Sequence, residues 1–258
     1  MPMSRLAALP RTLWRALATA AVLLGGAAIV ATTFGWVSPA TRLAIRRRWS
    51  RALLGALGVA REVRWHSEPP DRRHGLVVAN HISFVDIFAI DAVASADFVS
   101  KDDVQHWPLV GAMARRSGTV FIERGSRRAA HRTQETMIER LHAGHRVAIF
   151  PEGTTTPGDD LLPFHGALFQ AAVEAGAPVH PVVVRYREAR GSPSRAAAYV
   201  GDTTLAQCVA TILGARGLVV ELEWLPAIAP PHADRRHLAH HAHQLIAHAV
   251  RRAANTGV

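Results

Sequence analysis

From about residue 75 onward, short apolar runs alternate with segments of helical spacing, and this alternation constrains the fold more than any other feature. The helical segments include residues 129–141 and 167–175. A short apolar run bounded by turn residues is typical of a buried strand. Strands that alternate with helices predict a single α/β domain with a mostly buried central sheet flanked by helices. The expected strands are Leu76–Ala79, Phe98–Ser100, Thr119–Ile122, Val147–Phe150, Val179–Tyr186, Ala197–Val200 and Leu218–Trp224. We interpret residues 61–74 and 187–196, which are rich in charge, proline and glycine, as loops.

Before this domain, residues 16–36 carry no charge at all (ALATAAVLLGGAAIVATTFGW). A helix of about 20 residues is long enough to cross the hydrocarbon core of a bilayer. The pair Gly25 and Gly26 also permits a bend, so a hydrophobic hairpin remains an alternative to a full span, and a cleaved signal peptide is a third interpretation. We therefore predict an N-terminal membrane helix or hairpin in residues 1–60, followed by the α/β domain in residues 61–258.

Basic residues flank the apolar segment on both sides. The denser cluster follows it, between residues 42 and 51, and favours a cytoplasmic position for the main domain. The formal net charge of the chain is +10, which indicates acidic partners such as anionic lipid or phosphorylated substrates. Cys208 is the only cysteine, so the chain has no internal disulfide, as expected in a reducing compartment.

His81 and Asp86 are separated by five positions, an unusual offset for a functional pair on one helix. Five steps along a regular helix place two side chains roughly 140° apart, so the pair cannot meet there. They can meet if His81 lies in the turn after strand Leu76–Ala79 and Asp86 lies in the first helical turn that follows. The carboxylate then fixes the tautomer of the imidazole and leaves its other nitrogen free to accept a proton. The alternative is a turn histidine that caps its own helix.

Polar residues also follow two other expected strands. GTVFIER delivers Arg124 to a strand end, and FPEGTTT places Glu152, Gly153 and Thr154 in a sharp turn. Arginine binds phosphate groups through bidentate hydrogen bonds, although a lone arginine after a strand is more often a solvated surface residue. Because ligands of open α/β sheets collect beyond the carboxyl ends of strands, we expect these residues to converge with His81 on one cleft.

Four segments, in order NHISFVD, GTVFIER, FPEGTTT and APVHPVVVRY, resemble the motif blocks of the glycerolipid acyltransferase family, which includes the 1-acylglycerol-3-phosphate acyltransferases. The resemblance covers about residues 45–225. It implies acyl transfer from acyl-CoA or acyl-carrier protein to a hydroxyl of a lysolipid, with no other cofactor. It further implies a general base at His81, an orienting carboxylate at Asp86 and a phosphate-binding Arg124. Glu152, Gly153 and Thr154 then fall in the block that binds the acceptor.

The resemblance favours 1-acyl-sn-glycerol 3-phosphate as the acceptor and phosphatidic acid as the product. One departure leaves an alternative open, because Phe164 is followed by His165 where many relatives have lysine. The pattern is also similar to a bacterial branch with lyso-ornithine-lipid acyltransferases, whose acceptor has no phosphate. The implied location is a bacterial inner membrane, with the catalytic domain on its cytoplasmic side. Backbone N–H groups near the helix start are candidate donors to the developing oxyanion, and Lys101 is a weaker one.

The histidine-rich stretch RRHLAHHAHQLIAHAVRR near the C-terminus raises the question of a metal site, with His237, His241 and His248 as candidate ligands. An apolar stripe along the same helix favours an amphipathic helix packed on the domain or on lipid, so we predict no metal. No nucleic-acid-binding module is recognisable, and we expect no nucleic acid partner. A non-catalytic lysolipid-binding protein and a membrane-bound metallohydrolase remain as rival classes.

Overall fold

The computed structural model describes residues 9–66, 74–106, 110–122 and 127–255. Within these ranges, seven strands form one sheet in the order β1-β7-β6-β2-β5-β3-β4. All neighbouring strands are parallel except the antiparallel pair β6 and β7. The strands are β1 (Val59–Trp65), β2 (Gly75–Ala79), β3 (Asp97–Lys101), β4 (Val120–Ile122), β5 (Arg146–Ile149), β6 (Val179–Arg187) and β7 (Leu218–Trp224).

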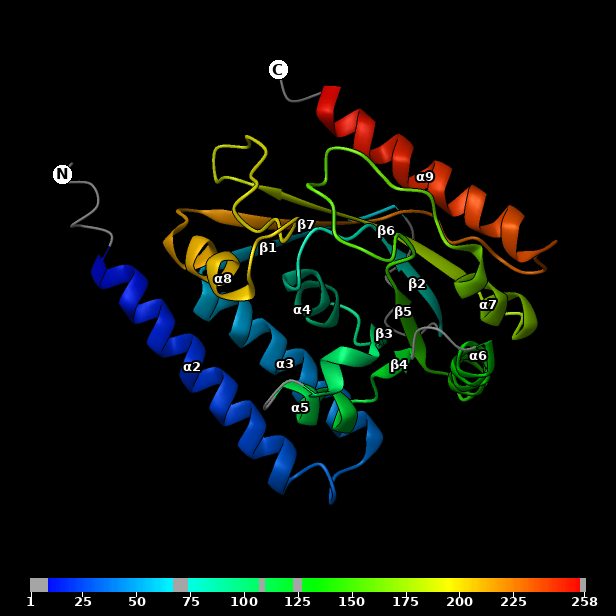
Figure 1. The fold of residues 1–258 in the computed structure, drawn as a ribbon, viewed down its shortest axis with the longest axis horizontal. Coiled ribbons are helices and arrows are strands. Elements are labelled where there is room, and N and C mark those ends of the chain that lie inside the picture. Colours follow the sequence, from blue (N-terminus) through cyan, green and yellow to red (C-terminus); the bar gives the residue numbers. More distant parts are fainter. Residues whose placement is uncertain (1–8, 67–73, 107–109, 123–126, 256–258) are drawn as a thin grey trace.

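Helices cover both faces of the sheet (Figure 1). One face packs against α3 (Pro39–Leu57), α4 (Val85–Asp91) and α8 (Leu205–Gly214), and the other against α6 (Arg127–His142), α7 (Gln170–Glu174) and α9 (Arg235–Asn255). The remaining described helices are α2 (Leu9–Thr32), α5 (Val110–Arg116) and two short 3-10 turns, η2 (Asp102–His106) and η3 (Gly166–Phe169). The α/β architecture expected from the sequence is confirmed.

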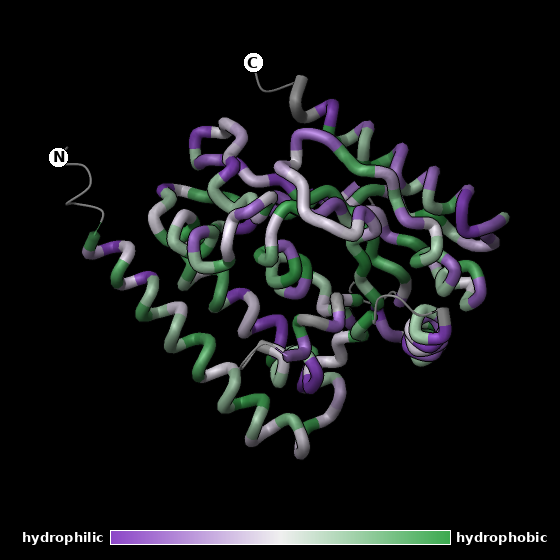
Figure 2. Tube along the Cα trace, in the orientation of Figure 1, coloured by the Kyte–Doolittle hydropathy of each residue, from purple (hydrophilic) through white to green (hydrophobic). Residues whose placement is uncertain are grey.

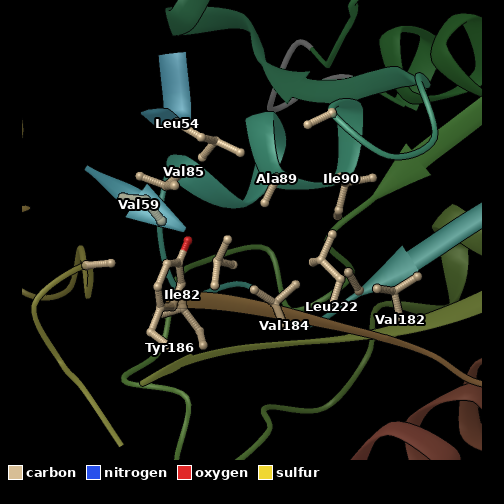
Figure 3. Close-up of a cluster of buried hydrophobic side chains, with 14 of the residues drawn as sticks. Leu54, Val59, Ile82, Val85, Ala89, Ile90, Val182, Val184, Tyr186 and Leu222 are labelled. Atoms are coloured by element: carbon tan, nitrogen blue, oxygen red, sulfur yellow. The ribbon is translucent and has the colours of Figure 1, made fainter. Parts of the chain in front are cut away.

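Strand β2 shows why the apolar runs are continuous rather than alternating. Val77 and Ala79 point into the core beneath α3, α4 and α8, whereas Leu76 and Val78 point into the core beneath α6, α7 and α9. All five residues of β2 are buried. A strand that is covered on both faces needs apolar side chains at every position. Figure 3 shows the first of these cores, in which Val182 and Val184 of β6 lie opposite Ala89 and Ile90 of α4.

Two predictions about elements were wrong. Residues 61–65, interpreted as part of a loop, belong to β1, which pairs in parallel with β7 along its whole length. Residues 197–200, expected as a strand, lie in a turn where the N–H of Tyr199 donates to the carbonyl of Ile82 and Ala197 packs in the core near Cys208. The other six expected strands correspond to β2 through β7, with ends that agree or differ by one residue.

The N-terminal segment forms a helical hairpin, in which the chain descends along α2 and returns along α3 (Figure 1). Helix α2 is the one described helix that is long and apolar enough to cross a membrane, and few of its residues are buried. Figure 2 shows α2 as a largely apolar rod at one side of the molecule. Its start is fixed to the domain, because Arg11 and Arg15 donate hydrogen bonds to carbonyls at the C-terminal end of α8, among them that of Gly214.

Helix α3, the second arm of the hairpin, is bound to the domain by a buried ion-pair cluster. Arg46 donates to Asp91 at 2.8 Å, to Asp97 at 3.3 Å and to the carbonyl of Ser117 at 2.7 Å. The second oxygen of Asp91 accepts from the hydroxyl of Ser50 at 3.0 Å. The boundary expected at residue 60 falls inside β1, so α3 and the first strand follow each other without a linker.

Candidate active site

His81 and Asp86 meet at the carboxyl end of β2, in the turn that leads to α4. The Nδ1 atom of His81 lies 2.9 Å from the Oδ2 atom of Asp86. The Asp86 side chain is fully buried, whereas the His81 side chain is 19% exposed. The pair therefore combines a shielded carboxylate with an imidazole that reaches the surface.

The local backbone explains the offset of five residues. Helix α4 begins only at Val85, so Asp86 stands in its first turn and reaches back over the preceding residues. Its Oδ2 atom also accepts from the backbone N–H groups of Ile82 at 2.7 Å and Ser83 at 2.9 Å. These two N–H groups were candidates for oxyanion donors from their place near the helix start, and here they donate to Asp86.

The contacts of the His81 ring define its tautomer and orientation. A carboxylate only accepts hydrogen bonds, so the proton on the ring lies on Nδ1 and points to Asp86. The opposite nitrogen, Nε2, is then an acceptor. The ring also stacks on Phe150 at the end of β5, with centroids 3.9 Å apart and an interplanar angle of 14°. These two contacts hold the imidazole in one orientation.

Glu152 lies beneath the same turn. Its Oε1 atom accepts from the backbone N–H of His81 and its Oε2 atom from the backbone N–H of Leu162, both at 2.9 Å. The residue is only 4% exposed. Burial raises the pKa of this carboxyl, although both N–H groups act in the opposite direction. Glu152 thus joins the turn after β2 to the segment that follows β5. Its role in acceptor binding stays a prediction.

Gly153 and Thr154 continue the turn after Glu152. Gly153 has a φ of +71°, and a Cβ atom at this position would lie 3.2 Å from the ring of His165. Both the backbone conformation and the approach of His165 therefore favour glycine at this position. Thr154 is exposed. Two residues later, the N–H of Thr156 donates to the carbonyl of His81 at 2.8 Å, so the turn is bonded to the base on both sides.

Arg124, the expected phosphate ligand, lies outside the described residues. The described part of its segment ends with β4 at Ile122, and β5 and β3 separate β4 from β2 in the sheet. The side chain of Lys101, the weaker oxyanion candidate, also lies outside the described residues.

The C-terminal segment contains the three histidines that were considered as metal ligands. They belong to α9, whose Leu238, Ala242 and Ile246 pack on the sheet face opposite α4. His237, His241 and His248 are exposed. Within the described residues, no group of three histidine, cysteine or acidic side chains is arranged to hold a metal ion. Cys208 is buried in α8, on the α4 side of the sheet.

One contact of the site has no counterpart in the sequence analysis. The hydroxyl of Tyr186, in β6, donates to the Oδ1 atom of Asp86 at 2.6 Å. Tyr186 is the last residue of the fourth motif block, two positions after a run of buried valines. Its position in that block was the only available signal, because the sequence does not show which buried tyrosine meets which carboxylate.

The fold and the His81–Asp86 pair define an α/β protein that holds an oriented imidazole at the carboxyl edge of a mostly parallel sheet. A family model described as Acyltransferase matches residues 61–185. The lyso-ornithine lipid O-acyltransferase of Pseudomonas aeruginosa is 40% identical over 90% of this chain and 92% of its own length. The 1-acyl-sn-glycerol-3-phosphate acyltransferase of Neisseria meningitidis is 38% identical over 68% of each chain.

Among solved structures, the 1-acyl-sn-glycerophosphate acyltransferase PlsC of Thermotoga maritima superposes with a TM-score of 0.70 over 97% of both chains, at 21% identity. That likeness shows the fold. The identities to the two bacterial relatives show the family, and the chain belongs to the glycerolipid acyltransferases. The enzyme class expected from the motif blocks is confirmed at the level of a lysolipid acyltransferase.

Proposed function

We propose that the protein transfers an acyl group from a thioester, acyl-CoA or acyl-carrier protein, to the free hydroxyl of a lysolipid. The observation that carries the proposal is the bond between His81 Nδ1 and Asp86 Oδ2, because it leaves Nε2 of the partly exposed ring as a hydrogen-bond acceptor. A hydroxyl is a poor nucleophile at neutral pH, and a positioned base contributes about 10²- to 10⁴-fold to its reaction.

The transfer is a direct displacement that needs no nucleophile from the protein. His81 Nε2 removes the hydroxyl proton while the acceptor oxygen attacks the carbonyl carbon of the thioester. The C–S bond then breaks, and the leaving thiolate takes the proton from His81. The products are an ester and a free thiol, and the imidazole returns to its neutral form. Asp86 stabilises the imidazolium that exists between the two proton transfers.

We favour a lyso-ornithine lipid as the acceptor. The match to the Pseudomonas relative of that name extends over 90% of the chain, whereas the match to the Neisseria 1-acyl-sn-glycerol-3-phosphate acyltransferase covers 68%. His165 in place of a fixed cation also supports an acceptor without phosphate. The motif blocks alone favour 1-acyl-sn-glycerol 3-phosphate, with Arg124 on its phosphate, and that lipid is the second candidate.

Membrane docking through α2 is part of the proposal. Leu13, Trp14 and Leu17 on α2 are each at least 60% exposed to solvent, and Trp36 in the turn after α2 is 90% exposed. Large apolar side chains in such a row gain free energy when they enter lipid. Helix α2 is also fixed along the domain through Arg11 and Arg15, which supports a hairpin that lies against the bilayer. The inner membrane, with the domain on the cytoplasmic side, is the location we propose.

The test offers purified protein both donors, labelled acyl-CoA and acyl-carrier protein, with lyso-ornithine lipid and lysophosphatidic acid as separate acceptors. We expect labelled product from the lyso-ornithine lipid, and no product with His81→Ala. The matched control is His237→Ala, which removes an exposed imidazole from α9. Product only from lysophosphatidic acid would overturn the proposed acceptor and retain the chemistry.

The same assay separates the rival classes. Transfer at the wild-type rate by His81→Ala would overturn the base mechanism. Absence of product with both donors and both acceptors, from a protein that still binds lysolipid, would favour the non-catalytic lipid-binding class. Loss of activity on addition of a chelator would favour the metallohydrolase.

A further inference from the structure

The two oxygens of the Asp86 carboxylate have different partners. Oδ2 accepts from His81 Nδ1 and from the N–H groups of Ile82 and Ser83. Oδ1 accepts from the hydroxyl of Tyr186 at 2.6 Å, which is the partner that the described residues provide for it. A fully buried anionic oxygen without a hydrogen-bond donor raises the free energy of the folded state. The bond from Tyr186 therefore stabilises Oδ1.

Tyr186 is suited to act as a permanent donor. The residue is 5% exposed and stands in the apolar core, where Figure 3 shows its ring close to Ile82 and Val184. Burial, together with the charge of Asp86, raises the pKa of its phenol well above the usual value. The hydroxyl therefore keeps its proton at neutral pH. Because an ionised carboxylate only accepts hydrogen bonds, the phenolic proton points toward Asp86.

The scaffold that carries Tyr186 is rigid. Strand β6 lies between β2 and β7, and Tyr186 pairs with Val220 in the antiparallel ladder. Two residues earlier, the backbone of Val184 exchanges two hydrogen bonds with the side chain of Asn80, the neighbour of His81. The donor and the turn that holds the base are thus fixed to the same part of the sheet, as accurate placement of a catalytic group requires.

We propose that Tyr186 is a positioning residue of the acyl transfer, which acts through Asp86 to hold the imidazole of His81 and to moderate the basicity of its partner carboxylate. This inference rests on the proposed function. The hydrogen bond on Oδ1 fixes the plane of the carboxylate, so that Oδ2 faces Nδ1. It also withdraws negative charge from Oδ2. Without it, the more basic carboxylate holds the imidazolium more tightly and returns the proton to the leaving thiolate less readily.

Tyr186→Phe removes the hydroxyl and keeps the ring, so the core stays filled. We expect kcat to fall roughly 10-fold, with little change in the KM for either substrate, because the interaction acts on the proton transfers and not on binding. The acid limb of the pH–rate profile should move to higher pH by about half a unit to one unit, since the imidazolium is held more tightly. The matched control is Tyr199→Phe, which removes the hydroxyl of the other tyrosine and should leave the acid limb in place.

A double-mutant cycle with Asp86→Asn tests whether Tyr186 acts through Asp86. In the Asp86→Asn background, Tyr186→Phe should change kcat by about 2-fold or less, because the charge that it modulates is already gone. The low-field proton signal of His81 Nδ1–H should also shift in Tyr186→Phe and remain in place in Tyr199→Phe.

Two outcomes would overturn the proposal. The first is a Tyr186→Phe variant whose acid limb does not shift and whose loss of activity only follows its loss of melting temperature. That result would indicate a purely structural role for Tyr186. The second is a full effect of Tyr186→Phe in the Asp86→Asn background. Either result leaves the proposed function intact if His81→Ala is inactive. Full activity of His81→Ala would instead remove the basis of both.

Discussion

The side chain of Asn80 continues the ladder between β2 and β6 after β2 has ended. Its Nδ2 atom donates to the carbonyl of Val184 at 3.0 Å, and its Oδ1 atom accepts from the N–H of Val184 at 2.7 Å. Asn80 is fully buried and directly precedes His81. The asparagine that opens the first motif block therefore anchors the catalytic turn to the strand of the fourth block.

We predict that Asn80→Ala destabilises the protein by roughly 2–4 kcal/mol, because it leaves the buried N–H and carbonyl of Val184 without their partners at this edge. Equilibrium unfolding in urea measures this loss. Gln244→Ala, which removes an exposed amide from α9, serves as the control. An Asn80→Ala variant as stable as the Gln244→Ala control would contradict the anchoring role.

The raised pKa of Glu152 predicts a pH-dependent effect of Glu152→Gln. The folded protein binds this proton at a higher pH than the unfolded chain does, because burial disfavours the charged carboxylate. The stability that the group contributes is therefore fully present below its usual pKa and is lost as the pH rises through the folded value. Glutamine has no such proton, so the destabilisation caused by Glu152→Gln should be larger near pH 4 than at pH 7.

Urea unfolding of wild type and Glu152→Gln at both pH values tests this direction. The difference between their free energies of unfolding reports Glu152 alone, because the titration of all other groups cancels. Glu188→Gln, at an exposed position, reports the effect of removing one surface carboxylate. A destabilisation by Glu152→Gln that grows as the pH rises would show that burial is not the dominant influence on this carboxyl.

Gly153→Ala should destabilise the turn after β5 by about 1–2 kcal/mol, because a side chain at positive φ is strained. The new Cβ also lies 3.2 Å from the ring of His165, so that ring must move. Thermal unfolding and kcat measure the two effects. Gly166→Ala is the matched control, since a Cβ there meets its nearest neighbour, the carbonyl oxygen of Arg235, at 3.6 Å, an ordinary contact. Equal stability of the two variants would contradict the strain argument.

The double variant Trp14→Glu and Leu17→Glu should lose affinity for lipid vesicles by at least roughly 100-fold, because each apolar side chain gains about 1.5–3 kcal/mol on burial. Vesicle flotation measures the affinity, and the melting temperature should change little because both side chains are exposed. The control is His241→Glu with Gln244→Glu, which adds the same two acidic residues to α9 on the other face of the sheet. Similar losses in both variants would indicate a general charge effect.

The sequence predicts well those elements whose burial can be recognised from the pattern of neighbouring residues. Strand β2 is apolar at every position, and its two faces meet two cores. Strand β1 was missed because Arg61, Glu62 and Arg64 give it the composition of a loop. Its charges have partners on distant strands, for example Glu62 with Arg187 and Arg64 with Glu221. Such pairing depends on the three-dimensional fold and leaves no local signal.

The same distinction holds in the site. The meeting of His81 and Asp86 follows from a turn of five residues, so local geometry suffices to predict it. The bond from the His81 N–H to Glu152 spans 71 positions, and the bond from Tyr186 to Asp86 spans 100. Motif order shows that these segments belong together. The roles of individual atoms depend on how the strands are arranged, which only the structure provides.

Helix α4 is only seven residues long and has a carboxylate near each end. Asp86 in its first turn binds His81, and Asp91 in its last turn accepts a hydrogen bond from Arg46 on the second arm of the hairpin. The helix therefore connects the second arm of the hairpin directly to the turn that holds His81. When α2 is embedded in a bilayer, the distance between His81 and the membrane surface is therefore fixed as well. In the proposed reaction, the acceptor hydroxyl of the lipid must then lie at that same distance from the membrane surface.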